Sequence, residues 1–187
     1  MSGRFRIVET PMAGLHLVER QRLGDERGFL TRLFCADELA GLGWDGPVAQ
    51  VNETGTREAG TVRGMHYQLP PFAEIKLVTC VAGAVLDVAV DLRRNSPTFL
   101  QHFATELSAE NARSLLIPRG FAHGFQALSG DVRMVYAHSA PYRAEAEAGL
   151  HAGDPGLGLK WPLPVANLSA RDSSHPFITG QFHGVTA

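Results

Sequence analysis

Two neighbouring runs of sequence, IKLVTCVAG (residues 75–83) and AVLDVAVDL (residues 84–92), decide the fold class. Both are rich in β-branched residues, and the second alternates along its length as a β-strand does. A glycine, Gly83, separates them. The pair therefore predicts two successive strands joined by a short turn.

The same pattern continues in both directions along the chain. Strand-like runs from FRIVET (residues 5–10) to VRMVYAHSA (residues 132–140) are separated by Gly, Pro, Asn and Asp. Their spacing of about 8–12 residues is typical of an all-β sandwich or barrel. Only CADELAGLG (residues 35–43) and AEAEAG (residues 144–149) favour short helical turns. We predict one domain over residues 1–187, an all-β jelly-roll-like barrel with a few short helices.

Composition narrows the class of protein. The 187 residues are 44% hydrophobic and 19% charged, with a net charge of -2, so neither nucleic acid nor a membrane surface is an expected partner. No run approaches the ~20 apolar residues of a membrane helix, and the N-terminus lacks an apolar signal core. Cys35 and Cys80 lie in apolar contexts and are expected to be buried free thiols. We therefore expect a cytoplasmic protein.

The C-terminal part, residues 154–176, combines many Gly and Pro residues with apolar ones. In a free tail, the apolar side chains of Trp161, Leu163 and Leu168 would stay exposed to water. Burying them would stabilise the fold. We expect this segment to wrap around the barrel and to bring Asp172 back to the core.

Polar residues interrupt one of the predicted strands. VRGMHYQ (residues 62–68) contains Arg63, His66 and Gln68, and Lys76 opens the next strand. A lone histidine in a strand is usually satisfied by a backbone carbonyl. Several polar side chains together are costly inside a barrel unless they are paired or bind a ligand. Small barrels hold ligands in their mouths, so the group indicates a binding pocket.

A second cluster, IPRGFAHGF (residues 117–125), contains P-x-G-x-x-H and resembles the second half-motif of the cupin superfamily. That resemblance implies that His123 points into the barrel. Metal-binding cupins add H-x-H and a glutamate from the first half-motif. Here that motif has His66 but has Gln68 in place of the second histidine, with Glu74 further on. We therefore expect no metal.

Several short motifs occur in order along the chain: GDERGF (24–29), QVN (50–52), VRGMHYQ (62–68), the long run 76–93, SPTF (96–99), LSAEN (107–111), IPRGFAHGF (117–125), DP (154–155), WP (161–162) and LSARD (168–172). Together they resemble the dTDP-4-dehydrorhamnose 3,5-epimerase family of cupin-fold nucleotide-sugar epimerases over about residues 15–175. The resemblance implies inversion at C3 and C5, or at one of them, of a nucleotide-linked 4-keto-6-deoxyhexose through an enolate. It implies no cofactor.

The resemblance also implies roles for individual residues. His66 is the base, since a histidine titrates near working pH, and Asp172 orients it and stabilises its protonated form. Lys76 stabilises the enolate oxygen. Tyr142 matches the proton donor on the opposite face of the sugar, and Tyr136 matches a pocket tyrosine.

The remaining matched positions are expected to bind substrate. Arginine forks suit diphosphate oxygens, and amides and imidazoles suit sugar hydroxyls or phosphates. The expected diphosphate contacts are Arg27 and Arg63, and the other contacts are Gln50, Asn52, Gln68 and His123. Arg27 lies on a segment that serves the partner's site in the family, so a homodimer is expected.

Some positions depart from the family pattern. Ala137 follows Tyr136 where the family commonly has a lysine, Ala152 and Gly153 replace Trp-Asn, and residues 100–102 replace Gly-x-Trp. The sequence therefore indicates the reaction type better than it indicates the exact sugar or the base of the nucleotide. Two other interpretations remain open. One is a ketoisomerase acting on a similar sugar nucleotide. The other is a metal-binding cupin, such as a dioxygenase, or a non-catalytic sugar-binding barrel.

Overall fold

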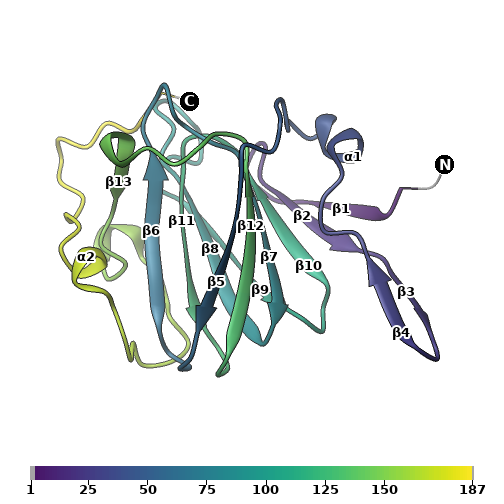
Figure 1. Cartoon of the computed structure of the whole chain (residues 1–187). Helices are drawn as coiled ribbons and strands as arrows, with labels where there is room; N and C mark the ends of the chain where they lie inside the picture. Colours follow the sequence, from purple (N-terminus) through teal and green to yellow (C-terminus); the bar gives the residue numbers. More distant parts are fainter. Residues whose placement is uncertain (1–2, 187) are drawn as a thin grey trace.

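The computed structural model describes residues 3–186, which form two β-sheets packed face to face with a small hairpin projecting from one end (Figure 1). The six-stranded sheet has the order β1 (Phe5–Glu9), β2 (His16–Arg20), β10 (Arg113–Ile117), β7 (Lys76–Ala82), β12 (Val132–His138) and β5 (Gln50–Thr56). The five-stranded sheet has the order β13 (Glu147–Gly149), β6 (Val62–Gln68), β11 (Phe121–Ala127), β8 (Ala84–Asp91) and β9 (His102–Ser108). The hairpin consists of β3 (Arg22–Asp25) and β4 (Gly28–Thr31). The prediction of an all-β jelly-roll-like barrel is confirmed.

The helical segments are short. They are α1 (Ala36–Ala40), the 3-10 turns η1 (Ala144–Ala146) and η2 (Pro155–Leu157), and α2 (Ala170–Ser173). Two of them, α1 and η1, fall where the sequence predicts helical turns. Within residues 3–186, no helix has the length and apolar character needed to cross a membrane.

The two runs that decide the fold class form β7 and β8, and they belong to different sheets. Gly83 makes the turn between them with a φ of 72°. A Cβ at this position would lie 2.5 Å from the Ser129 hydroxyl oxygen and 3.3 Å from the Cα of Val132. Glycine is therefore required where the chain crosses from one sheet to the other.

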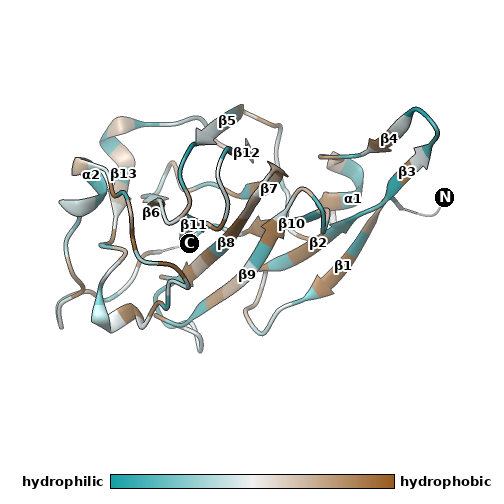
Figure 2. Ribbon diagram, turned by 90° about the horizontal axis from the view of Figure 1, so that it is seen from below, coloured by the Kyte–Doolittle hydropathy of each residue, from teal (hydrophilic) through white to brown (hydrophobic). Residues whose placement is uncertain are grey.

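The main core lies between the sheets, and β7 and β8 are among the hydrophobic strands that enclose it (Figure 2). Both sheets are also covered on their outer faces. Residues around α1, including Leu39 and Trp44, pack on the six-stranded sheet. Leu157 and Trp161 pack against β6, β8 and β11. For this reason, strand β8 carries apolar side chains on both of its faces.

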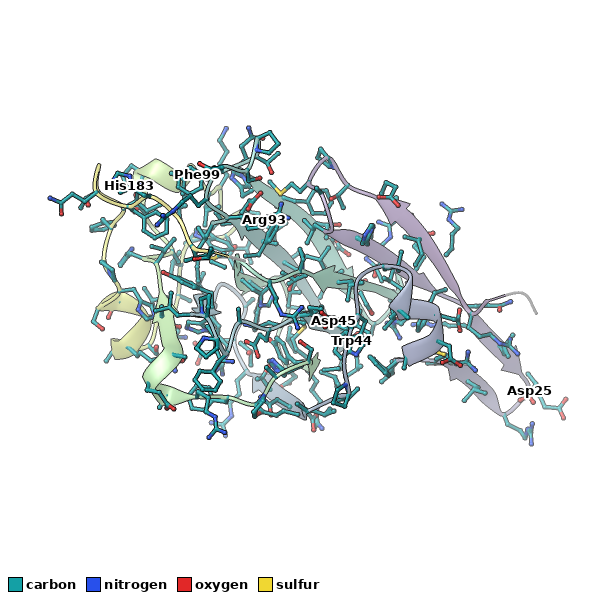
Figure 3. The ribbon with its side chains drawn as sticks, turned by 90° about the horizontal axis from the view of Figure 1, so that it is seen from above. Asp25, Trp44, Asp45, Arg93, Phe99 and His183 are labelled. Atoms are coloured by element: carbon teal, nitrogen blue, oxygen red, sulfur yellow. The ribbon has the colours of Figure 1, made fainter. Side chains whose placement is uncertain are left out.

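Residues 154–176 pack along the barrel, as the sequence predicts, with the Leu163 N–H donating to Gln126 Oε1 of β11 at 3.0 Å, and the residues that follow them also pack on it. Val185 donates its N–H to the Leu92 carbonyl at 2.7 Å, and the rings of Phe99 and Phe182 stack with centroids 6.1 Å apart. Figure 3 shows this end of the chain, labelled at His183, beside Phe99 and far from the hairpin tip at Asp25.

Both cysteines are free thiols. Cys80 is buried, as predicted, but the prediction of a buried Cys35 is wrong, because Cys35 is only half-buried. It immediately precedes α1, at the edge of the segment that covers the six-stranded sheet.

Candidate active site

A cavity of about 750 Å³ opens between the two sheets and is bounded on one side by the segment that leads into α2. Most of the residues that the sequence singles out line it: Asn52, Arg63, His66, Lys76, His123, Tyr136 and Asp172. They come from β5, β6, β7, β11, β12 and α2. The fold therefore gathers positions spread over most of the chain into one site.

A β-bulge in β6 places Arg63 and His66 on the same wall. His123 of β11 pairs with His66, whereas Phe125, two residues on, pairs with Arg63, three residues back. Strand β6 thus has one extra residue, which reverses the alternation of side chains locally. Regular alternation would have put Arg63 and His66 on opposite faces.

Gly64 makes this bulge possible. Its φ is +128°, and a Cβ would lie 2.5 Å from the Cα of Gly124 on the adjacent strand. Only glycine tolerates both this conformation and this approach. The Gly64 N–H donates to Asp172 Oδ2 at 3.3 Å, so the bulge also helps to hold the carboxylate.

His66 and Asp172 form a dyad. His66 Nε2 lies 2.8 Å from Asp172 Oδ1, and the carboxylate is almost fully buried. Asp172 is held in place by α2, where its N–H donates to the Ser169 hydroxyl that caps the helix, at 3.0 Å. Because the carboxylate accepts the proton on Nε2, the Nδ1 of a neutral His66 carries a lone pair.

The environment keeps the dyad in the form His66 neutral and Asp172 ionised. Burial lowers the pKa of His66 below its ordinary value, and the hydrogen bond and charge of Asp172 offset only part of that effect. Burial raises the pKa of Asp172, but hydrogen bonds from His66 and Gly64 together hold this pKa below its ordinary value. The arrangement provides a neutral base beside a fixed negative charge.

Two residues beside the dyad are not among the predicted site residues. Arg171 Nη2 lies 3.3 Å from His66 Nε2, and its Nη1 donates to Glu147 Oε1 at 2.8 Å. His175 Nε2 lies 3.9 Å from Asp172 Oδ1. Arg171 immediately precedes Asp172 and His175 follows it by three positions, and this closeness in the sequence was the available signal.

Lys76 is held by a buried carboxylate. Its Nζ lies 3.0 Å from Glu74 Oε1, and His138 Nδ1 donates to Glu74 Oε2 at 2.9 Å. Burial raises the pKa of Glu74, but the bond from His138 and the charge of Lys76 hold it below its ordinary value. Glu74 therefore anchors two side chains of the cavity wall. Sequence reasoning treated it only as a metal ligand.

His123 is fixed by a second carboxylate. Its Nε2 donates to Oδ2 of the fully buried Asp87 at 2.9 Å. Asp87 lies within AVLDVAVDL, where an acidic residue interrupts the apolar run. That interruption was the signal for a partner, because a buried carboxylate needs one.

The two tyrosines are placed differently. Tyr136 lines the cavity on the six-stranded sheet, facing the His66 wall, and burial raises its pKa. Tyr142 is 50% exposed and is not part of the cavity lining. Its hydroxyl donates to Glu147 Oε2 at 2.9 Å, a hydrogen bond that raises the pKa of Tyr142. The structure therefore does not bring the expected proton donor, Tyr142, onto the cavity wall, since it is held in the loop before β13.

Three of the expected binding residues lie off the cavity wall. Arg27 is in the hairpin turn, with its side chain 84% exposed and paired with Asp25. Gln50 accepts the N–H of Tyr142 at 2.9 Å. Gln68 spans the strand end, where it donates to the Phe72 carbonyl at 3.1 Å.

The metal-ligand set of the cupin pattern does not converge. Gln68 bonds backbone groups, Glu74 bonds Lys76 and His138, and His123 bonds Asp87. Each of these side chains therefore has a protein partner of its own.

Comparisons with known proteins identify relatives that match most of the chain. A family model described as dTDP-4-dehydrorhamnose 3,5-epimerase matches residues 9–179. The dTDP-4-dehydrorhamnose 3,5-epimerase of Sinorhizobium fredii is 43% identical over 168 residues, covering 89% of this chain and 86% of that protein. The enzyme of the same name from Streptomyces griseus is 44% identical, covering 88% of this chain and 82% of that protein.

Solved structures show the same fold. The crystal structure of dTDP-4-dehydrorhamnose 3,5-epimerase from Bacillus anthracis with TDP and PPi bound superposes with a TM-score of 0.89 at 38% identity, covering 93% of this chain and 99% of that one. A 3'-monoepimerase from Streptomyces bikiniensis in complex with dTDP-quinovose gives a TM-score of 0.83 at 34% identity, covering 90% and 85%. The chain belongs to the dTDP-4-dehydrorhamnose 3,5-epimerase family, whose members are isomerases of nucleotide-linked sugars.

Proposed function

We propose that this protein inverts C3, C5 or both centres of a nucleotide-linked 4-keto-6-deoxyhexose, with dTDP-4-keto-6-deoxyglucose as the first candidate substrate. The observation that carries the proposal is the His66–Asp172 dyad facing Tyr136 and Lys76 across one cavity. One chain, acting as a single domain, supplies all of these groups.

The reaction begins with proton transfer to His66. A C–H bond beside a ketone is acidic because the electron pair it leaves becomes an enolate. Nδ1 of His66 takes this proton, and the charge of Asp172 stabilises the imidazolium that forms. The ammonium group of Lys76 then stabilises the enolate oxygen as negative charge develops there.

A proton returned from the opposite face inverts the centre. We assign this donor to Tyr136 rather than to Tyr142, because Tyr136 is on the wall opposite His66 and Tyr142 bonds Glu147 outside the cavity lining. The tyrosinate that remains is reprotonated from solvent, and the proton held by His66 is lost to solvent. The cycle has no net oxidation or reduction, so it requires no cofactor.

Positive charge at the cavity mouth suits a diphosphate. Arg63 is held there by the Thr56 hydroxyl at 3.1 Å and by the Gly55 carbonyl. Arginine presents a planar fork to phosphate oxygens. Asn52 and His123 supply further polar groups to the same cavity and fit sugar hydroxyls or phosphate oxygens.

The hairpin β3–β4 supports a homodimer. Phe29 and Leu30 are 61% and 71% exposed on a hairpin that projects from the barrel (Figure 1), and a two-stranded hairpin is only marginally stable alone. Packing on a second copy would bury both side chains and carry Arg27 toward the partner's cavity. Light scattering should report a dimer, and Leu30→Ser should weaken it.

The free thiols of Cys35 and Cys80 fit a cytoplasmic location, because the cytoplasm is reducing.

Turnover of dTDP-4-keto-6-deoxyglucose, followed by proton NMR, tests the function. An epimer of the sugar should accumulate, whereas dTDP-glucose, which lacks the ketone, should stay unchanged. A product with the carbonyl moved from C4 would favour a ketoisomerase instead. If neither product forms, the proposed substrate class is wrong.

A further inference from the structure

Three metal-ligating side chains converge beside the cavity: His66 and Asp172 of the dyad, and His175, for which the proposed reaction has no use. Their ligand atoms all lie within 4.8 Å of one another. Two imidazoles and one carboxylate form a ligand set typical of zinc. We propose that this cluster binds one divalent transition metal ion, with zinc as the best match, and that the ion switches the enzyme off.

The two separations that involve Asp172 fit such an ion after small movements, and the two imidazoles, whose ligand atoms lie within 4.8 Å of each other, have to move closer together. Zinc–ligand bonds of about 2.0–2.2 Å at tetrahedral angles place neighbouring ligand atoms about 3.3 Å apart. Asp172 Oδ1 lies 2.8 Å from His66 Nε2 and 3.9 Å from His175 Nε2. The carboxylate sits too close to one imidazole and too far from the other by about half an ångström each, which side-chain rotation can correct.

The position of His175 is specific. Its ring lies against Gly149, where a Cβ would come within 2.3 Å of Nε2, so a glycine makes room for the imidazole. Gly149 pairs with His66 across β13 and β6, which places the slot at the level of the dyad. Nε2 of His175 is buried and has no hydrogen-bond partner among residues 3–186. A metal ion would give this atom the partner it lacks.

Arg171 competes with a metal ion for the ligand atoms of His66 and Asp172. Its Nη2 lies 3.3 Å from His66 Nε2 and its Nε lies 3.4 Å from Asp172 Oδ1, so a cation has to displace it. The guanidinium is about half exposed and already bonds Glu147, so it can move outward without losing every partner. The wild-type affinity is therefore set by competition, and removal of the Arg171 charge should strengthen metal binding.

The consequence for activity follows from the ligand atoms. Metal binding releases the proton that His66 Nε2 shares with Asp172, and the ion then occupies both groups. A metal-bound imidazole is a weak base, and Asp172 can no longer stabilise an imidazolium. Proton abstraction should therefore stop, and a chelator should restore it.

Isothermal titration of the full-length chain with ZnCl₂, without substrate, tests the site. The expected result is one zinc per chain, with affinity reduced more than about 100-fold in both His175→Phe and His175→Asn, since loss of a direct ligand exceeds the effect of a supporting residue. Arg171→Gln should bind zinc more tightly. The exposed His183, which belongs to neither this cluster nor the cavity lining, provides the matched control, and His183→Ala should bind like the wild type.

Equal affinity in the wild type and both His175 variants would overturn the proposal, as would the absence of stoichiometric binding. Circular dichroism of the variants separates misfolding from ligand loss. The titration requires no turnover, so its outcome is independent of the proposed epimerase activity. In an active enzyme, one equivalent of zinc should abolish turnover and EDTA should restore it.

Discussion

Asp172→Asn should reduce the rate of proton abstraction by about 1,000-fold. The imidazolium that forms on His66 lies next to a buried carboxylate, with Nε2 and Oδ1 2.8 Å apart. The charge on the ring is delocalised, so the charge centres are about 4 Å apart. At an effective dielectric constant of about 20 their attraction is about 4 kcal/mol, or close to three powers of ten in rate. An asparagine retains the shape of the side chain and removes this attraction.

The assay is the initial rate of deuterium incorporation into dTDP-4-keto-6-deoxyglucose in heavy water. Asp154→Asn is the matched control, because Asp154 is a buried aspartate in the same wrapping segment and its Oδ1 accepts the N–H of Gly156 at 2.7 Å. Asp154 is in no hydrogen bond with His66. A loosened C-terminal segment would slow both variants, whereas loss of the dyad slows only Asp172→Asn.

An exchange rate of Asp172→Asn within about threefold of the wild-type rate, with the fold intact, would show that the Asp172 charge does not assist proton abstraction. A milder loss of about tenfold would place the effective dielectric constant of the site far above 20. Because Asp172 raises the pKa of His66, the variant should also shift the acid limb of its pH profile to lower pH.

Further predictions concern the other cavity residues, pH and stability. Tyr136→Phe should lower the rate of product formation by about 10²–10⁴-fold, while proton exchange at the His66 face persists. Tyr142→Phe should form product at a rate within about tenfold of the wild-type rate. Proton NMR measures product formation and deuterium incorporation separately in the same reaction. Lys76→Met should lower kcat by about 10²–10³-fold in the same assay, the usual effect of losing one group that stabilises an oxyanion. The acid limb of kcat/KM should lie below the ordinary pKa of histidine, because burial lowers that of His66, and a midpoint above 6.5 would contradict this. Burial raises the pKa of Asp91, but hydrogen bonds from neighbours led by Arg93 outweigh it and lower the value from 3.8 to about 2. Asp91 should therefore contribute about 2 kcal/mol of stability above about pH 4 that is lost as pH falls through about 2, and urea unfolding of Asp91→Asn at pH 7 and pH 2 should show it.

The strands were predictable because alternation and turn residues act locally. The same is true of α1, which begins right after Cys35, within the predicted stretch. The return of Asp172 to the core was predictable for another reason, since the apolar residues near it need burial. Each of these inferences depends on residues close together in sequence or on the general cost of exposing apolar surface.

The arrangement of the site was less predictable, because it depends on long-range pairing. Alternation alone places Arg63 and His66 on opposite faces, and only the register of β11 against β6 reveals the bulge that unites them. The two tyrosines are both plausible acids in the sequence, and only the sheet pairing of Tyr136 separates it from Tyr142. Likewise, the anchoring role of Glu74 requires knowing that β12 lies beside β7.

The most direct test of the central claim compares wild type and His66→Asn for deuterium incorporation at C3 and C5 of dTDP-4-keto-6-deoxyglucose, in heavy water containing a chelator. We expect rapid exchange at one or both carbons in the wild type and a loss of at least about 1,000-fold in His66→Asn. Exchange that continues at the wild-type rate in His66→Asn, or that requires an added metal ion, would contradict it.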